Sequence, residues 1–254
     1  MRNVRGVLSK AAPFFLIATV LAPGGLGVGA KESSVSPTQV ESLVNMIVDA
    51  YGGREVLKNI HSLSAKGVIV SPLYEGPAEY SFELMRDRKL RVETRFGNSF
   101  EVRLLNGEHG YYQTADAPMT DVSGARLLSM VYQFKELTMP YQLMMSAFII
   151  TEGGRSTVNG IPVKVLMLKD KEGPPMRLYV DTKNRRIIKD SGIFSMGGSE
   201  TELSSEFHDF RKVGGRLLPF RIVNYVGGQK IGEIRIHEYR VNPELRDALF
   251  VPEK

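Results

Sequence analysis

Few side chains in this sequence could carry acid–base, metal or nucleophilic chemistry, and they are scattered. The sequence has no cysteine, and its histidines do not stand at metal-ligand spacing from one another. These histidines are His61, His109, His208 and His237. His208 is followed by Asp209, but adjacent strand residues point to opposite faces, so we do not expect them to act as a pair. The sequence therefore predicts no metal site and no cofactor.

Nucleophile and phosphate-binding motifs are missing as well. The mature sequence contains no G-x-S-x-G elbow and no P-loop lysine motif. Glu200 and Glu202 share one face of a predicted strand and could act as general acid and base, although two such acids are ordinarily a solvated face. There is no tryptophan on which a sugar could stack. These residues give no positive indication of catalysis, and we expect a protein that is not an enzyme.

The first 30 residues have the three-part pattern of a secretory signal. "MRNVRGVLSK" has three basic residues and no acid, "AAPFFLIATVLA" is a short apolar run, and "GLGVGA" ends in small residues. The pattern predicts a signal peptide over residues 1–30, cleaved after Ala30, and export to a bacterial periplasm. The alternative is an uncleaved membrane anchor, but the apolar run is short for a membrane span.

The remaining residues, 31–254, have a length that suits a single domain with its own core. Without the signal peptide the chain has 30 Lys and Arg against 28 Asp and Glu. This small net charge gives no reason to expect nucleic acid as a partner. An exported domain without cysteine is held together by its core alone. We expect a monomer that does not span a membrane.

Alternating apolar residues predict a sheet protein with few helices. "SPTQVESLVNMIVDAYGG" has apolar residues at helical spacing and predicts a first helix, with Ser36 as its cap. In "PAEYSFELM", Tyr80, Phe82 and Leu84 share one face of a strand. About five strands are predicted before residue 124 and about six after residue 150. The expected fold class is α+β, with a strongly curved antiparallel sheet of about 10–12 strands that forms an incomplete β-barrel.

Between these two blocks of strands lies a long apolar stretch, Leu127–Ile150. As one helix it would be long enough to cross a bilayer, but Lys135 and Glu136 lie near its centre and Pro140 interrupts it. We therefore expect two short helices, within about 124–150, that cover the sheet together with the first helix. These residues alone do not decide whether the two helices form permanent core or a movable lid over an apolar ligand.

Several segments resemble the LolA/LolB-like family of periplasmic outer-membrane lipoprotein carriers. They are "VESLVNMIVDAYGGREVLKNIHSLSAKGVI", a strand with "LRVE", "LLNGEHGYYQ", the apolar helical pair, "SEFHDFRKVGGRLLPFRIVNY" and "YRVNPELRDALFVPE". The resemblance covers the whole mature chain and lies in the order and spacing of elements. The chain departs from the carriers by lacking tryptophan and by its longer "TADAPMTDVSGA" segment before the apolar pair.

The resemblance implies a curved sheet whose apolar hollow takes up acyl chains beneath helices that act as a lid. It also implies that Arg91, in "LRVE", tethers the lid. The side chains that we expect in the acyl-binding hollow are Tyr80, Phe82, Leu84, Met130, Phe134, Tyr141, Met144, Met145 and Phe148.

The expected function is a periplasmic carrier that moves a lipid or lipoprotein between membranes, with inner- and outer-membrane proteins as possible partners. The alternatives are an envelope module that senses lipid or lipoprotein without transferring it and, third, a hydrolase whose site has no recognisable motif.

Overall fold

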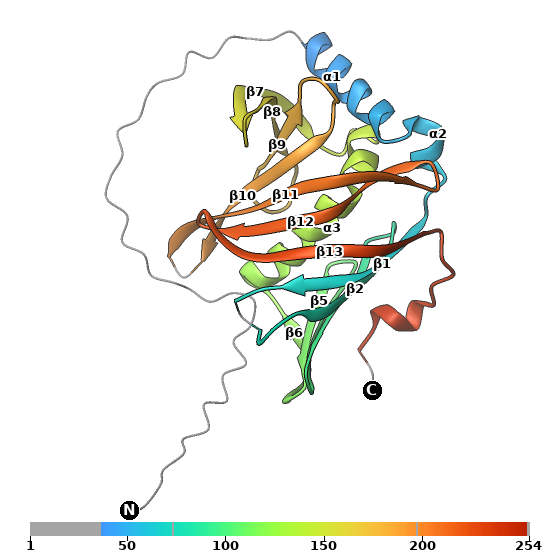
Figure 1. Ribbon diagram of the computed structural model, residues 1–254, viewed down its shortest axis with the longest axis vertical. Helices are drawn as coiled ribbons and strands as arrows, with labels where there is room; N and C mark the ends of the chain where they lie inside the picture. The colour runs from blue at the N-terminus through green and yellow to red at the C-terminus, as the bar shows by residue number, and fades with distance from the viewer. Residues whose placement is uncertain (1–36, 73, 197, 253–254) are drawn as a thin grey trace, which may run out of the picture. The chain divides into compact units, whose positions relative to one another are not determined.

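The computed structural model in Figure 1 describes residues 37–252 apart from residues 73 and 197. These residues lie within one compact unit. The expected signal peptide, its cleavage point at Ala30 and the expected cap Ser36 lie outside the described residues.

Among the described residues, three α-helices and one short 3-10 helix accompany the sheet. They are α1 (Pro37–Ala50), α2 (Gly53–Lys58), α3 (Gly124–Met144) and the 3-10 helix η1 (Asp247–Phe250). The predicted first helix is confirmed, because Leu43, Ile47 and Val48 on its apolar stripe are buried. It ends before Gly52, whose φ of 118° excludes most other residues. A Cβ on Gly52 would also lie 2.6 Å from the carbonyl oxygen of Gly215.

The strands form one antiparallel sheet, in the order β6-β5-β4-β3-β2-β1-β13-β12-β11-β10-β9-β8-β7. They are β1 (Ser62–Val70), β2 (Ala78–Met85), β3 (Lys89–Phe96), β4 (Ser99–Asn106), β5 (His109–Thr114), β6 (Ala117–Val122), β7 (Ile149–Val158), β8 (Ile161–Lys169), β9 (Met176–Asp181), β10 (Ile187–Met196), β11 (Ser199–Val213), β12 (Arg216–Val226) and β13 (Gln229–Val241). The α+β class and the antiparallel sheet are confirmed.

The strand count exceeds the prediction because both edge strands were missed. β6 comes from the segment "APMTDV", for which no strand was predicted, and β7 starts inside the expected second lid helix. Both are exposed on both faces over most of their length, so neither shows the apolar alternation that marks a half-buried strand.

The sheet is open, which corrects the expectation of a strongly curved, incomplete barrel. Within the described residues, β6 pairs only with β5 and β7 only with β8. The chain leaves the sheet at the edge strand β6 and re-enters it at the opposite edge, β7. Helix α3 is the connection, so it must cross one face, and it contacts β4 and β5 in one half and β10 in the other (Figure 1).

Helix α3 is a single helix, not the two short helices that were predicted. It runs for 21 residues through Pro140. A proline costs a helix one hydrogen bond, and here packing of the helix against the sheet outweighs that cost. The helix ends at Met144, and Ser146 follows with a left-handed φ of 54°. The covering element is therefore 124–144, and residues 145–150 lead into β7.

Candidate ligand-binding cavity

Two glycines allow α3 to lie close to the sheet. A Cβ on Gly110 in β5 would lie 2.9 Å from the Leu127 side chain and 3.2 Å from the sulfur of Met130. A Cβ on Gly192 in β10 would lie 2.7 Å from the ring of Tyr132. Separations under 3 Å are closer than real Cβ contacts, so any larger residue at either position would force the facing side chains of α3 to shift.

A buried lysine attaches the middle of α3 to the loop between β8 and β9. The ammonium of Lys135 lies 2.5 Å from a carboxylate oxygen of Asp170 and donates a 2.5 Å hydrogen bond to the carbonyl of Glu172. Lys135 is only 7% exposed. A lysine that is buried so completely needs such partners, so this contact holds the helix at a defined position.

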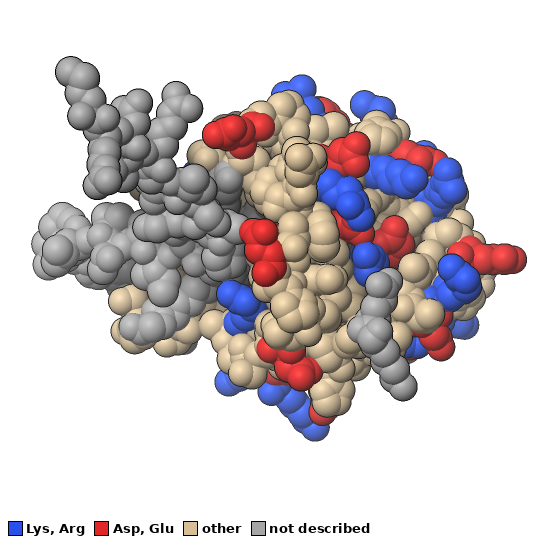
Figure 2. Space-filling view, turned by 90° about the horizontal axis from the view of Figure 1, so that it is seen from below, with Lys and Arg blue, Asp and Glu red and all other residues tan. Residues whose placement is uncertain are grey.

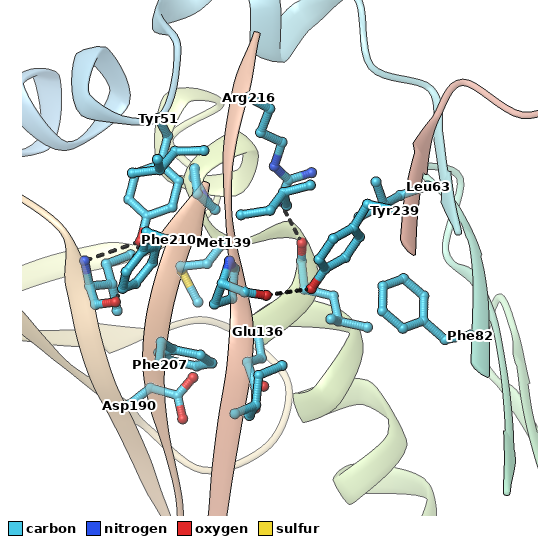
Figure 3. A pocket seen from close by; sticks show the side chains of 17 residues that line it. Tyr51, Leu63, Phe82, Glu136, Met139, Asp190, Phe207, Phe210, Arg216 and Tyr239 are labelled. Atoms are coloured by element: carbon cyan, nitrogen blue, oxygen red, sulfur yellow. Dashed lines mark hydrogen bonds between the residues drawn. The ribbon is translucent and has the colours of Figure 1, made fainter. Parts of the chain in front are cut away.

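An apolar cavity lies between α3 and strands β1, β2 and β10–β13 (Figure 3). Its volume is about 50 Å³, which is room for a few water molecules rather than for an acyl chain. The residues that line it are Tyr51, Leu63, Phe82, Glu136, Leu137, Met139, Pro140, Ile187, Asp190, Phe207, Phe210, Arg216, Leu217, Leu218, Pro219, Ile222 and Tyr239. Most are apolar, and three are ionisable acids or bases that the sequence analysis did not select.

Two acids, Glu136 of α3 and Asp190 of β10, share one part of this cavity (Figure 3). Burial raises the pKa of Glu136 from 4.5 to about 7, although a hydrogen bond with Ser205 opposes the shift. Burial, followed by the charge of Glu136, raises the pKa of Asp190 well above its usual range. The hydroxyl of Tyr132 donates to Asp190 over 3.2 Å. Burial therefore makes both carboxyl groups hold a proton to higher pH than exposed carboxyl groups would.

The polar contact of Glu136 in this cavity is the hydroxyl of Ser205. The hydroxyl of Ser205 lies 3.1 Å from a carboxyl oxygen of Glu136 and 3.2 Å from the side-chain oxygen of Asn224. A hydroxyl has one proton and cannot donate to both. Donation from Ser205 to Glu136 favours the ionised carboxylate and therefore opposes the effect of burial.

Arg216 approaches the same cavity from β12, away from the acids (Figure 3). It is 5% exposed, and one of its terminal nitrogens donates a 2.7 Å hydrogen bond to the carbonyl of Leu137 in α3. The Nε of Arg216 is buried without a hydrogen-bond partner among the described residues. The nearby phenol hydroxyls are engaged elsewhere, since Tyr239 donates to Pro219 and Tyr51 bonds the backbone of Ile187.

A second, smaller cavity shares Arg216 with the main cavity. It is lined by Leu57, Ile60, His61, Leu84, Arg86, Thr138, Tyr141 and Arg216. The guanidinium of Arg86 lies 4.6 Å from the ring centroid of Tyr141 and donates to the carbonyl of Lys58. Basic groups therefore line this cavity together with apolar ones, and it contains no acid.

The residues predicted to form the acyl-binding hollow are only partly brought together. Phe82 lines the main cavity, and Leu84 and Tyr141 line the second one. Tyr80, Met130 and Phe134 are buried but line neither cavity. Met144 is half-buried at the end of α3, Met145 is 57% exposed, and Phe148 lies beyond the helix. That these residues contact an acyl chain stays a prediction.

Arg91 lies on β3, on the face opposite the buried Leu90 and Val92. Its guanidinium pairs with Glu93 at 2.8 Å. Its tethering role stays a prediction, and the arginine that is observed to bond α3 is Arg216. Nothing in the segment "RLLPF" indicated that Arg216 would be buried, because most arginines on strands are exposed to solvent. Glu136 was read only as an obstacle to a membrane span, whereas a central acid in an apolar helix also signals a buried polar site.

Other kinds of site are not evident in the described part of the chain. No group of three His, Cys, Asp or Glu side chains gathers there as a metal site requires. None of the described helices has the length and apolar character that crossing a membrane demands. Figure 2 shows basic and acidic side chains interspersed over the described surface of one face. That face has no continuous basic patch of the kind that binds nucleic acid.

Solved structures share this fold. A putative outer membrane lipoprotein-sorting protein domain from Vibrio parahaemolyticus aligns with 11% identity and a TM-score of 0.54, over 84% of this chain and 96% of that one. A LolA superfamily protein from Nitrosomonas europaea aligns with 12% identity and a TM-score of 0.54, over 84% and 97%. A DUF1329 family protein from Desulfovibrio piger gives the same TM-score at 11% identity, over 84% and 97%.

Sequence comparison adds nothing to this likeness, because no protein-family model and no curated protein sequence matches the chain. At 11–12% identity the likeness is one of fold. The chain therefore has the fold of LolA-superfamily and lipoprotein-sorting domains, and the resemblance inferred from the sequence is confirmed at that level.

Proposed function

We propose that this protein binds the acyl chain of a lipid or of a lipid-modified protein between α3 and the sheet, and carries it through the periplasm between membranes. The observation that supports this proposal best is the apolar cavity beneath a single helix that crosses the sheet face. The likeness of fold to a lipoprotein-sorting domain is consistent with it.

Carrying an acyl chain through water requires an apolar enclosure and no covalent chemistry. Each buried methylene contributes about 0.8 kcal/mol, so a chain of about 14 methylenes gains on the order of 10 kcal/mol. The sheet supplies one wall of the enclosure, with Phe82 and Tyr239, and α3 supplies the other, with Met139. Methionine adapts to apolar partners of different shape.

Loading requires α3 to move away from the sheet, because the cavity of about 50 Å³ is too small for an acyl chain. Both ends of the helix are suited to such a motion. Gly124 at its start and Ser146 just after its end have φ angles of 57° and 54°, and left-handed residues often mark points where a chain changes direction. Ligand binding then shifts the population from a closed to an open position of α3.

Native mass spectrometry of the full chain, expressed with its own N-terminal segment and purified from the periplasm, tests this proposal. We expect co-purified lipid or lipoprotein at one equivalent, which exchanges into acceptor vesicles. Recovery of a stable complex with another protein, without exchangeable lipid, would favour the sensing function instead. Absence of any apolar ligand in periplasmic protein, together with failure to take up lipid from donor vesicles, contradicts the proposal.

A further inference from the structure

Two arginines that line the second cavity have no carboxylate partner. Arg86 and Arg216 both face this cavity, and within the described residues neither is part of an ion pair at 4.0 Å or less. Their hydrogen-bond acceptors among the described residues are neutral: Arg86 donates to the carbonyl of Lys58, and Arg216 to that of Leu137. The chain pairs other arginines with acids, such as Arg88 with Glu172 at 2.6 Å. The cavity therefore has positive charge that the protein does not neutralise.

The position of Arg216 makes this charge costly unless a ligand uses it. The residue is 5% exposed, and its Nε–H has no acceptor among the described residues. A buried cation without an anion, and a buried donor without an acceptor, are both unfavourable. Arginine does not relieve the cost by losing its proton. An oxyanion within hydrogen-bonding reach of Nε would satisfy the donor and the charge together.

The two cavities that share Arg216 differ in character. The second has basic residues and no acid, with the exposed His61 among its lining residues. The main cavity is mostly apolar. Arg216 lines both, so a ligand that spans them would place an anionic group at the arginines and an apolar chain beneath α3.

We infer that the second cavity is the headgroup site for an amphiphile whose head is an oxyanion, a carboxylate or a phosphate, and whose chain occupies the main cavity. This inference rests on the proposed function and specifies the class of lipid. The planar guanidinium of Arg216 offers parallel N–H donors that match the oxygens of such a head. Arg86 adds a second positive charge that remains accessible from the surface.

Calorimetric titration of the mature chain at pH 8 tests the site. The probes are dodecanoate, dodecyl phosphate, dodecan-1-ol and inorganic phosphate. The two anionic amphiphiles are kept below their critical micelle concentrations, and dodecan-1-ol below its solubility limit. In the unmodified chain we expect the two anionic amphiphiles to bind at least tenfold more tightly than the alcohol. Arg216→Met should reduce this ratio to about one, and Arg216→Lys should retain part of it. Arg221→Met is the matched control, because Arg221 lies on the same strand, lines neither cavity and pairs with Asp209.

The outcomes separate this inference from the function on which it rests. If the unmodified chain binds dodecan-1-ol as tightly as the two anionic amphiphiles, the inferred headgroup site is wrong. The proposed function as an acyl-chain carrier would not be affected. An undiminished ratio in a folded Arg216→Met variant leads to the same conclusion. If inorganic phosphate binds as tightly as dodecyl phosphate, the site takes a free oxyanion. That result would overturn the inference that its ligand is an amphiphile. If no amphiphile binds at all, the proposed function itself fails.

Discussion

Arg216 of β12 donates a hydrogen bond of 2.7 Å to the main-chain carbonyl of Leu137 in α3. Pro140 lies three residues further along and has no N–H to offer the carbonyl of Glu136, the neighbour of Leu137. The sheet thus holds α3 next to the point where the hydrogen bonding of the helix itself is weakest. This contact adds to the apolar packing of α3, in which Met130, Phe134 and Leu143 are buried.

Replacing Lys135 with methionine is expected to loosen α3. The ammonium loses Asp170 and the carbonyl of Glu172, and Asp170 is left partly buried without its partner. We expect the free energy of unfolding to fall by about 1–3 kcal/mol and amide exchange in 124–144 to become faster than in the rest of the chain. Urea denaturation and hydrogen exchange measure the two effects. Lys212→Met, at an exposed position, should change neither, and equal exchange in both variants contradicts the role of Lys135.

The stability of the protein should depend on pH through Glu136. The folded protein holds the proton more tightly than the unfolded chain, since the pKa is about 7 instead of 4.5. The contribution of Glu136 to stability therefore falls as pH rises from about 4.5 to about 7 and levels off above. In Glu136→Gln most of this fall should disappear, with a gain over the unmodified chain that grows to roughly 3 kcal/mol at most. Urea midpoints of the two proteins at pH 5 and pH 8 measure this difference in stability. If both proteins lose the same stability between these pH values, Glu136 is not the group responsible.

A methyl group at position 192 should displace α3. A Cβ there lies 2.7 Å from the ring of Tyr132, so Gly192→Ala forces the ring or the helix away from β10. We expect a loss of about 1–3 kcal/mol and increased mobility of a dye attached through Met145→Cys, which is feasible because the chain has no native cysteine. Gly232→Ala is the control, since its Cβ meets Ile69 at an ordinary 3.4 Å. A dye response that is the same in both variants would mean that α3 does not depend on Gly192.

Truncating Phe82 should enlarge the main cavity. Phe82 is fully buried and lines that cavity, so Phe82→Ala should cost about 3–5 kcal/mol of stability. A ligand that fills the new space should restore part of this loss by mass action. Leu105→Ala removes a buried side chain that lines neither cavity. Thermal unfolding with and without dodecanoate compares the two, and equal rescue of both variants argues against binding next to Phe82.

The sequence predicted well those elements whose two faces differ in polarity. In β2, Tyr80, Phe82 and Leu84 are buried and Glu79 is exposed, as the alternation indicated. The edge strands β6 and β7 were missed because both of their faces meet water over most of their length. Pro140 was taken as a helix boundary, but the packing of α3 against both halves of the sheet keeps the helix continuous.

The candidate site was predicted less well than the fold. Residues of the apolar stretch were predicted to line the acyl-binding hollow only because their side chains are apolar. In the structure Met145 is largely exposed, and Met130 and Phe134 are core residues that line neither cavity. The polar residues of the main cavity, Glu136, Asp190 and Arg216, are brought together only by tertiary packing. Three separate segments supply them, and no spacing along one segment could show that they meet.

The central claim is that an acyl chain enters between α3 and the sheet. The most direct measurement is a photo-crosslinking titration with a fatty acid that carries a diazirine at the end of its chain, followed by mass spectrometry of the labelled peptides. If an acyl chain enters there, labelling should saturate at one equivalent on residues of the main cavity, such as Phe82, Met139 and Phe207. This labelling should disappear when unlabelled lipid is added. Labelling confined to exposed residues such as Ile149, or labelling that does not saturate, would contradict the claim.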